Sequence, residues 1–184
     1  MSIDDPWITT YTGKQFFLTR ATVDDVCIED IAHGLSNTCR YAGQSRTFYS
    51  VAEHSVRMAE VVSFSSETML VALLHDAAEA YLGDVTSMVK ARLPVYKEME
   101  QYLQYVIYDK YNIRHCPSMN QDIECVKALD IMIRTPEVKS LFPRKYNAWS
   151  WKLIDYDYGD IHPWSHKKAE KKFLKMFKRL YEHT

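Results

Sequence analysis

The chain has 184 residues, of which 47% are hydrophobic and 26% charged, with 23 basic side chains against 24 acidic ones. This length fits one domain with a core that needs no disulfides, and the hydrophobic content excludes a disordered chain. A formal net charge of -1 gives no overall reason to expect a protein that binds a nucleic acid polymer.

The first elements are expected to be a hairpin and a helix. Residues 7–20 surround Thr12-Gly13-Lys14 and predict a β-hairpin, because glycine supplies the positive φ of a tight turn. Apolar residues at helical spacing predict a helix over residues 28–38. The polar residues from Asn37 to Thr47 then predict a connecting loop.

The middle of the chain predicts a series of helices. Ser50 and Glu53 form a capping box that begins a helix reaching about Val62, because both side chains can satisfy free backbone amides of the first turn. Pro136 should end the last helix of this series, because proline disrupts a helix interior. The other helices are expected over residues 67–82, near 87–92, over 94–111 and over 120–134.

The C-terminal part combines an irregular segment, 143–163, with a helix over about 164–181 that carries a run of lysines on one face. Such a run is typical of a solvated face, and binding of phosphates or an acidic partner is the alternative. Without repeats or linkers, we expect a single mainly α domain. Its parts are a hairpin and lead-in over 1–27, a helical core over 28–135 and a C-terminal loop and basic helix over 136–184.

No signal points to a membrane or to an oxidising compartment. No apolar run reaches the roughly 18 residues that a membrane-spanning helix needs, and the first residues do not resemble a secretory signal. The cysteines form no C-x-x-C pair, so reduced and mostly buried thiols in a cytoplasmic protein are expected. They are Cys27, Cys39, Cys116 and Cys125.

Ionisable residues are concentrated in VALLHDAAEAYLGD, residues 71–84. His75 and Asp76 are adjacent polar groups in an apolar helix, and a buried carboxylate is costly unless it is paired or bound to a metal. Glu79 can share a flank of this helix with His75 and Asp76. Asp84 follows the helix end, where the chain can turn back toward the same place. Core packing does not explain this concentration.

His54 and Asp130 interrupt two other apolar helical patterns. Taken alone, a buried histidine is more often hydrogen-bonded, and an aspartate within a helix is more often in a salt bridge. Together with His75 and Asp76, they offer two imidazoles and two carboxylates, which suit a borderline divalent ion and leave positions for water and substrate. Zinc or cobalt is favoured, with manganese or iron as the alternatives.

The order of His54, His75-Asp76 and Asp130 resembles the H…HD…D signature of the HD-domain metal-dependent phosphohydrolases. This resemblance implies an HD-type helical bundle in which these residues hold a divalent ion. A metal-bound water is then the source of hydroxide that attacks phosphorus.

Flanking motifs extend the resemblance over roughly residues 8–135. S-V-A-E-H-S at 50–55, H-D-A-A-E at 75–79 and G-D-V-T at 83–86 are similar to the bacterial 5′-deoxynucleotidase branch. The run over 28–43 is similar to small phage and prophage HD proteins, among them dATP triphosphohydrolases.

The resemblance also implies roles for the neighbouring residues. Glu79 would be the general acid or base, with orientation of a ligand histidine as the alternative. Asp84 would lie near the sugar and the scissile phosphate, with a helix-capping contact as the alternative. Substrate contacts are expected from Arg40 and Tyr41, which match an Arg-aromatic pair, from Lys90, which matches a basic position, and from Arg46.

We therefore expect a phosphohydrolase that cleaves dATP to deoxyadenosine and triphosphate. The first alternative is a 5′-deoxynucleotidase that releases phosphate from deoxynucleoside monophosphates. A nucleotide-binding or partner-binding HD protein without turnover and a cyclic-dinucleotide phosphodiesterase are further alternatives. The expected partner is a deoxynucleotide and neither a nucleic acid polymer nor a membrane. A homo-oligomer, located in the host cytoplasm if a phage encodes the chain, is also expected.

Overall fold

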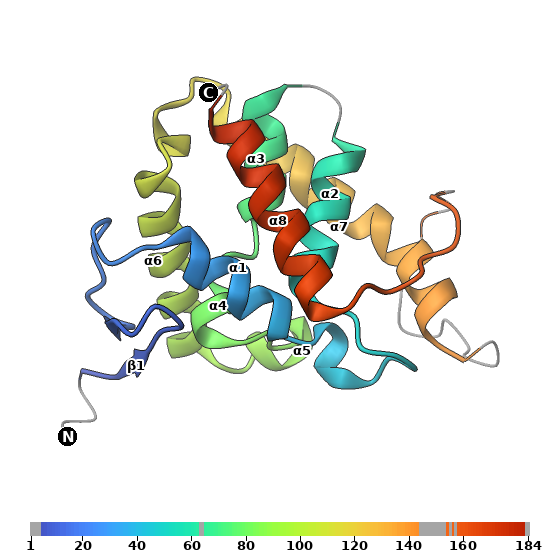
Figure 1. The fold of residues 1–184 in the computed structure, drawn as a ribbon, viewed down its shortest axis with the longest axis horizontal. Coiled ribbons are helices and arrows are strands. Elements are labelled where there is room, and N and C mark those ends of the chain that lie inside the picture. Colours follow the sequence, from blue (N-terminus) through green and yellow to red (C-terminus); the bar gives the residue numbers. More distant parts are fainter. Residues whose placement is uncertain (1–4, 63–64, 144–153, 155, 157, 183–184) are drawn as a thin grey trace.

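A computed structural model describes residues 5–62, 65–143, 154, 156 and 158–182, which form a mainly helical single domain with a short N-terminal hairpin (Figure 1). Strand β1 (Trp7–Thr9) pairs antiparallel with β2 (Gln15–Phe17), as the sequence predicts. The turn between them contains Gly13, whose φ of 85° favours glycine.

The helices cover most of the rest of the described chain. They are α1 (Ile28–Asn37), α2 (Val51–Val61), α3 (Ser66–Leu74), α4 (Glu79–Leu82), α5 (Ser87–Lys90), α6 (Pro94–Lys110), α7 (Met119–Leu141) and α8 (His166–Tyr181). Two 3-10 turns, η1 (Arg40–Gly43) and η2 (Ile113–His115), lie in the connections. These bounds confirm most of the predicted helices and correct two of them.

The helix predicted over residues 67–82 is broken in the middle. It ends as α3 at Leu74 and resumes as α4 at Glu79. Between them, the backbone makes tighter turns, in which the Ala77 N–H donates to the Leu74 carbonyl at 3.1 Å and the Glu79 N–H donates to the Asp76 carbonyl at 3.0 Å. His75 and Glu79 therefore do not lie on one uninterrupted helical flank.

The helix predicted over residues 120–134 does not stop before Pro136. It continues as α7 to Leu141, and the side chains around the proline are buried. Thr135, for example, is 1% exposed and donates to the Ile154 carbonyl at 2.6 Å. This burial and the contacts of the last turns offset the backbone hydrogen bond that proline cannot make.

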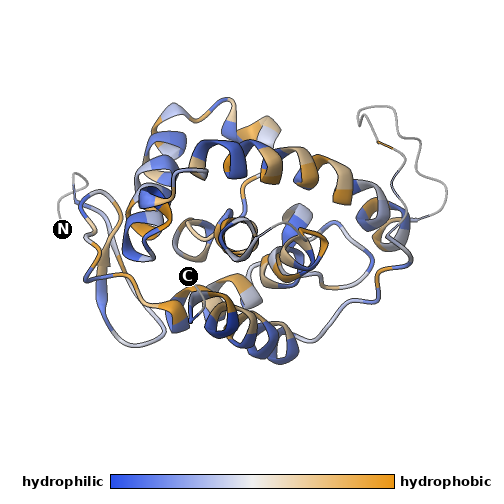
Figure 2. Cartoon of the chain, turned by 90° about the horizontal axis from the view of Figure 1, so that it is seen from above, coloured by the Kyte–Doolittle hydropathy of each residue, from blue (hydrophilic) through white to orange (hydrophobic). Residues whose placement is uncertain are grey.

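Helices α2 and α3 lie in the middle of the fold. Helix α8 packs on α1, α2 and α3, whereas α7 packs on α3 and α2 from another side (Figures 1 and 2). The inner face of α8 is apolar and includes the fully buried Phe173, while its outer face is hydrophilic (Figure 2). The predicted lysine run lies on that outer face, mostly exposed to solvent.

Only half of the predicted capping box forms. The Ser50 hydroxyl accepts the Glu53 N–H at 3.1 Å, as expected. The Glu53 carboxylate instead accepts two hydrogen bonds from Arg57, at 2.9 and 2.7 Å, and one from the Trp164 N–H at 2.7 Å. Glu53 thus connects α2 to the segment before α8. The predicted irregular segment, 143–163, lies in large part outside the described residues.

The four cysteines are free thiols, as predicted, but they are half-buried and not mostly buried. Among the residues described, none of the helices combines the length and the apolar character needed to cross a bilayer.

Gly34 lies where α1 and α4 approach each other closely. A Cβ atom at this position would lie 2.7 Å from the Ala80 carbonyl oxygen and 2.9 Å from the Ala80 Cβ. Such overpacking costs about 1–3 kcal/mol, and the better helix propensity of alanine returns only about 1 kcal/mol. We predict that Gly34→Ala lowers the free energy of unfolding measured in urea. An unchanged or higher urea midpoint would contradict this close approach.

Candidate metal centre

Residues from separate helices converge next to the break between α3 and α4. His54 comes from α2, whereas His75 and Asp76 come from the break itself. One ligand atom from each of these three residues lies within 4.8 Å of the other two. His54 is fully buried, and Asp76 retains some exposure. This group could hold a metal ion, as the sequence predicts.

Asp130, the fourth predicted ligand, lies on α7 at the edge of this group. Its Oδ1 atom is 3.2 Å from the Nε2 atom of His54 and 2.8 Å from the guanidinium of Arg40. Asp76 contacts the other histidine, with its Oδ2 atom 3.0 Å from His75 Nε2, and lies farther than Asp130 from His54, at 3.9 Å from His54 Nε2.

The hydrogen bonds of the two imidazoles suit metal ligation. His75 Nδ1 donates to the Ala72 carbonyl at 2.7 Å, and His54 Nδ1 donates to Glu137 Oε1 at 2.6 Å. Because Nδ1 is engaged, Nε2 is the nitrogen of each ring that is left to bind a metal, which requires the neutral form of the ring. Both Nε2 atoms are buried without a hydrogen-bond partner in the described chain. These donors fit a divalent metal ion.

Glu137 is a fully buried carboxylate that the sequence analysis missed. Besides His54, it accepts hydrogen bonds from the Tyr49 hydroxyl at 2.9 Å, from the Tyr41 hydroxyl and from Arg40 Nε at 3.2 Å. Burial alone would raise the pKa of Glu137, but Arg40, His54 and these hydrogen bonds lower it to about 2.

A sequence signal for Glu137 existed. It follows Asp130 by two helical turns, which places both carboxylates on one side of an uninterrupted helix. The spacing between Asp130 and Glu137 was not used in the prediction, because the helix was expected to end before Pro136.

Arg40 is held by carboxylates at the centre. Besides Asp130 and Glu137, its guanidinium approaches Asp76 Oδ2 at 3.6 Å. Turn η1 makes this approach possible with Tyr41 and Ala42 in the left-handed region, at φ of 60° and 51°, which is unusual for residues other than glycine. With neutral histidines, three carboxylates and one guanidinium leave two negative charges, which favours a divalent cation.

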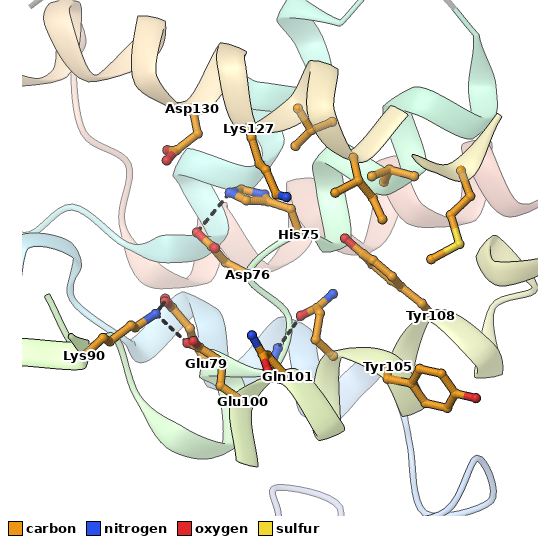
Figure 3. Close-up of a pocket in the computed structure, with 16 residues that line it drawn as sticks. His75, Asp76, Glu79, Lys90, Glu100, Gln101, Tyr105, Tyr108, Lys127 and Asp130 are labelled. Atoms are coloured by element: carbon orange, nitrogen blue, oxygen red, sulfur yellow. Dashed lines mark hydrogen bonds and ion pairs between the residues drawn. The ribbon is translucent and has the colours of Figure 1, made fainter. Parts of the chain in front are cut away.

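A cavity of about 490 Å³ opens beside the centre (Figure 3). Its wall includes His75, Asp76 and Asp130, together with two lysines. Lys90 was predicted as a substrate contact, whereas Lys127 was not predicted from the sequence. Lys127 lies one turn before Asp130 on α7, a spacing that could have indicated it. The wall also has a largely apolar part, made by residues of α3, α6 and α7: Val71, Tyr105, Tyr108, Met119, Ile123 and Val126.

Glu79 lies on the wall of this cavity and is 4% exposed. Its Oε1 atom accepts a hydrogen bond from Lys90 at 2.9 Å, and Lys90 also contacts Glu100 (Figure 3). Its Oε2 atom is buried and has no hydrogen-bond partner among the described residues. Burial, and then the charges of Asp76 and Asp84, raise the pKa of Glu79 well above its usual value. Glu79 is thus suited to hold a proton.

Two other predicted site residues lie off the cavity wall. Asp84 is half-buried near Arg40; burial raises its pKa, and the guanidinium opposes that effect. Arg46 is exposed and donates to the Ser140 carbonyl at 2.9 Å, so it connects the loop to the end of α7. The structure brings Asp84 to the edge of the centre and does not bring Arg46 there.

Fold and site together define a mainly helical protein with a buried His-His-Asp group that could bind a metal. No family model matches the chain. It is 40% identical over 135 residues to the uncharacterized protein YfdR of Escherichia coli. The aligned residues make up 73% of this chain and 72% of that protein. The chain belongs to the family of YfdR. It is also 36% identical over 115 residues to the uncharacterized protein RCAP_rcc00048 of Rhodobacter capsulatus, covering 58% and 59% of the two chains.

Glu137 makes the stability of the metal-free protein sensitive to acid. Its pKa is about 2 in the fold and ordinarily 4.5, so its contribution is complete above pH 4.5 and is lost as the pH falls through 2. This shift corresponds to about 3 kcal/mol. We predict that Glu137→Gln, whose amide cannot titrate, is less stable at pH 7 and loses less stability on acidification. Urea unfolding at a series of pH values measures both effects, and parallel profiles for the two proteins would contradict the prediction.

Proposed function

We propose that this protein is an HD-type phosphohydrolase that uses one divalent metal ion to hydrolyse deoxynucleoside phosphates. The observation that carries the proposal is the convergence of the buried Nε2 atoms of His54 and His75 with a carboxylate oxygen of Asp76 beside a cavity. Two imidazoles and a carboxylate that face one another in a core are costly to bury unless they bind something, and a metal ion is a ligand that suits all three. The H…HD…D order of the sequence supports the same proposal.

The metal would be held by His54, His75 and Asp76, with Asp130 as the fourth ligand. When bound, such an ion lowers the pKa of a coordinated water toward neutrality and polarises a phosphoryl oxygen. The hydrogen bonds on the far side of the two rings support this role, because Glu137 and the Ala72 carbonyl orient the two imidazoles. Zinc or cobalt is the favoured ion.

The two lysines on the cavity wall would bind the phosphate groups of the substrate. Lys90 and Lys127 both line the cavity that contains His75, Asp76 and Asp130. Ammonium groups bind phosphate oxygens as point charges, so these two lysines can hold phosphates beyond the one that reacts. The apolar part of the wall can accommodate an uncharged part of a ligand.

Glu79 would supply a proton to the leaving group. Water attacks the α-phosphorus and releases a proton to solvent, the bond from that phosphorus to the 5′ oxygen breaks, and the 5′ oxygen takes up a proton from Glu79, which solvent later restores. The carboxyl of Glu79, whose Oε2 atom is buried without a partner in the described structure, is placed beside Asp76 to give that proton. The products are deoxyadenosine and triphosphate when dATP is the substrate.

The choice of dATP rests on the resemblance of residues 28–43 to phage dATP triphosphohydrolases. Two lysines on the cavity wall are consistent with a substrate that carries several phosphates. The alternative, a 5′-deoxynucleotidase, needs to hold only the phosphate that is cleaved.

Product analysis tests the proposal. The protein is loaded with zinc, cobalt, manganese or iron in turn, incubated with dATP, dAMP and the other deoxynucleotides, and the products are separated by chromatography. Triphosphate with deoxyadenosine is the expected result, whereas orthophosphate from monophosphates alone would favour the nucleotidase. Absence of any product with all four metals would reject both activities.

Two variants separate metal binding from proton transfer. We predict that Asp76→Ala loses both the metal and turnover, because it removes a ligand. Glu79→Ala should keep the metal but lose about two to four orders of magnitude in rate, as expected for a general acid. Metal analysis and steady-state kinetics measure these effects. Normal metal content in Asp76→Ala, or an unchanged rate in Glu79→Ala, would contradict the assigned roles.

A further inference from the structure

The break between α3 and α4 contains a side chain from another helix. In an uninterrupted α-helix, the N–H of Ala78 would donate to the carbonyl of Leu74, four residues earlier. Here the carboxamide of Gln104, on α6, takes both places. Its Oε1 atom accepts the Ala78 N–H at 3.2 Å, and its Nε2 atom donates to the Leu74 carbonyl at 2.7 Å.

A carboxamide suits this position because it carries a donor and an acceptor side by side. Its orientation is fixed chemically, since only the oxygen can accept the Ala78 N–H and only the nitrogen can donate to Leu74. A side chain inserted between a carbonyl and its partner N–H is a known cause of a helix break. Gln104 thus satisfies the Ala78 N–H, which the break would otherwise leave without a partner, and gives the Leu74 carbonyl a second donor besides the Ala77 N–H.

The break determines where two candidate metal ligands lie. His75 and Asp76 are the first residues after Leu74, so they occupy the segment that Gln104 holds open. The Nδ1 atom of His75 donates to the Ala72 carbonyl, which leaves Nε2 facing Asp76 Oδ2 at 3.0 Å. Closing the helix would change the backbone path between Leu74 and Ala78, and with it the positions of His75 and Asp76 relative to His54.

We propose that Gln104 is a positioning residue of the metal centre, because its carboxamide holds the α3–α4 break open and thereby fixes His75 and Asp76. This proposal deepens the proposed function and rests on it for the role of the metal. Gln104 itself acts through the backbone of Leu74 and Ala78.

Helix α6 offers two matched controls. Gln101, one turn before Gln104, lines the same cavity, but its carboxamide makes no hydrogen bond with the described residues. Tyr102 donates its hydroxyl to the Ala21 carbonyl at 2.7 Å, so Tyr102→Phe removes a hydrogen bond from α6 to a backbone carbonyl away from the centre. Gln101→Met therefore controls for the change of side chain, and Tyr102→Phe controls for general loss of stability.

Amide hydrogen exchange of the metal-free protein tests directly whether Gln104 holds the Ala78 N–H. Methionine at position 104 fills a similar volume without a donor or an acceptor, so the Ala78 N–H loses its partner and the backbone between Leu74 and Ala78 is no longer fixed. We expect at least tenfold faster exchange at Ala78 in Gln104→Met and wild-type exchange there in both controls. Gln104→Glu keeps the acceptor, so its Ala78 exchange should stay near that of the wild type. Wild-type exchange at Ala78 in a folded Gln104→Met protein would overturn the proposal.

Cobalt binding, followed by its visible absorption, tests the positioning role. We expect the cobalt affinity of Gln104→Met to fall about 10- to 100-fold, the range for residues that orient metal ligands, and that of Gln101→Met and Tyr102→Phe to stay within twofold. Unchanged affinity in Gln104→Met, or an equal loss in Tyr102→Phe, would overturn the proposal. If the wild-type protein bound no cobalt, the proposed metal-dependent function would fail, and amide exchange would still decide whether Gln104 holds the break.

Discussion

The whole centre depends on the hydrogen bonds and ion pairs that stabilise the charge of one fully buried carboxylate, Glu137. A buried charge is tolerated only when partners and hydrogen bonds replace the water it has lost. The partners of Glu137 come from η1, α2 and the segment between them, and each is fixed by its contact with that carboxylate. The same contacts orient His54 and hold Arg40 against the carboxylates. Turn η1, which contains Arg40, has Tyr41 and Ala42 at positive φ, a conformation that is unfavourable for residues other than glycine. The geometry of the candidate metal site is therefore inseparable from the electrostatics of the surrounding core.

Local patterns in the sequence account for much of this fold. Apolar stripes predict most of the helices, and a glycine within a stretch rich in threonine and aromatic residues predicts the hairpin, because these signals depend on neighbouring residues only. The same local logic identifies His54, His75 and Asp76, which stand out as polar residues in apolar helices. The structure brings these three together, with Asp130 at their edge.

The predictions failed where a distant residue overrides a local rule. The break at His75 depends on Gln104, which belongs to another helix and gives no signal near the HD pair. Pro136 is a helix breaker by local criteria, yet α7 continues because burial on both sides of the proline outweighs the lost hydrogen bond. Arg40 and Arg46 look alike in the sequence, and only the packing of their loop decides that one meets carboxylates and the other a backbone carbonyl.

The layered arrangement separates two surfaces of the molecule. Helix α8 contributes its apolar face to the core, and in the described chain it supplies no side chain to the cavity or the metal group. Its lysine-bearing face is therefore free to vary in charge during evolution without altering the chemistry across the core. The opposite holds for α6 and α7, whose residues line the cavity and hold the histidines in place. Related proteins should consequently tolerate divergence on α8 and show coordinated change at positions 40, 104 and 137.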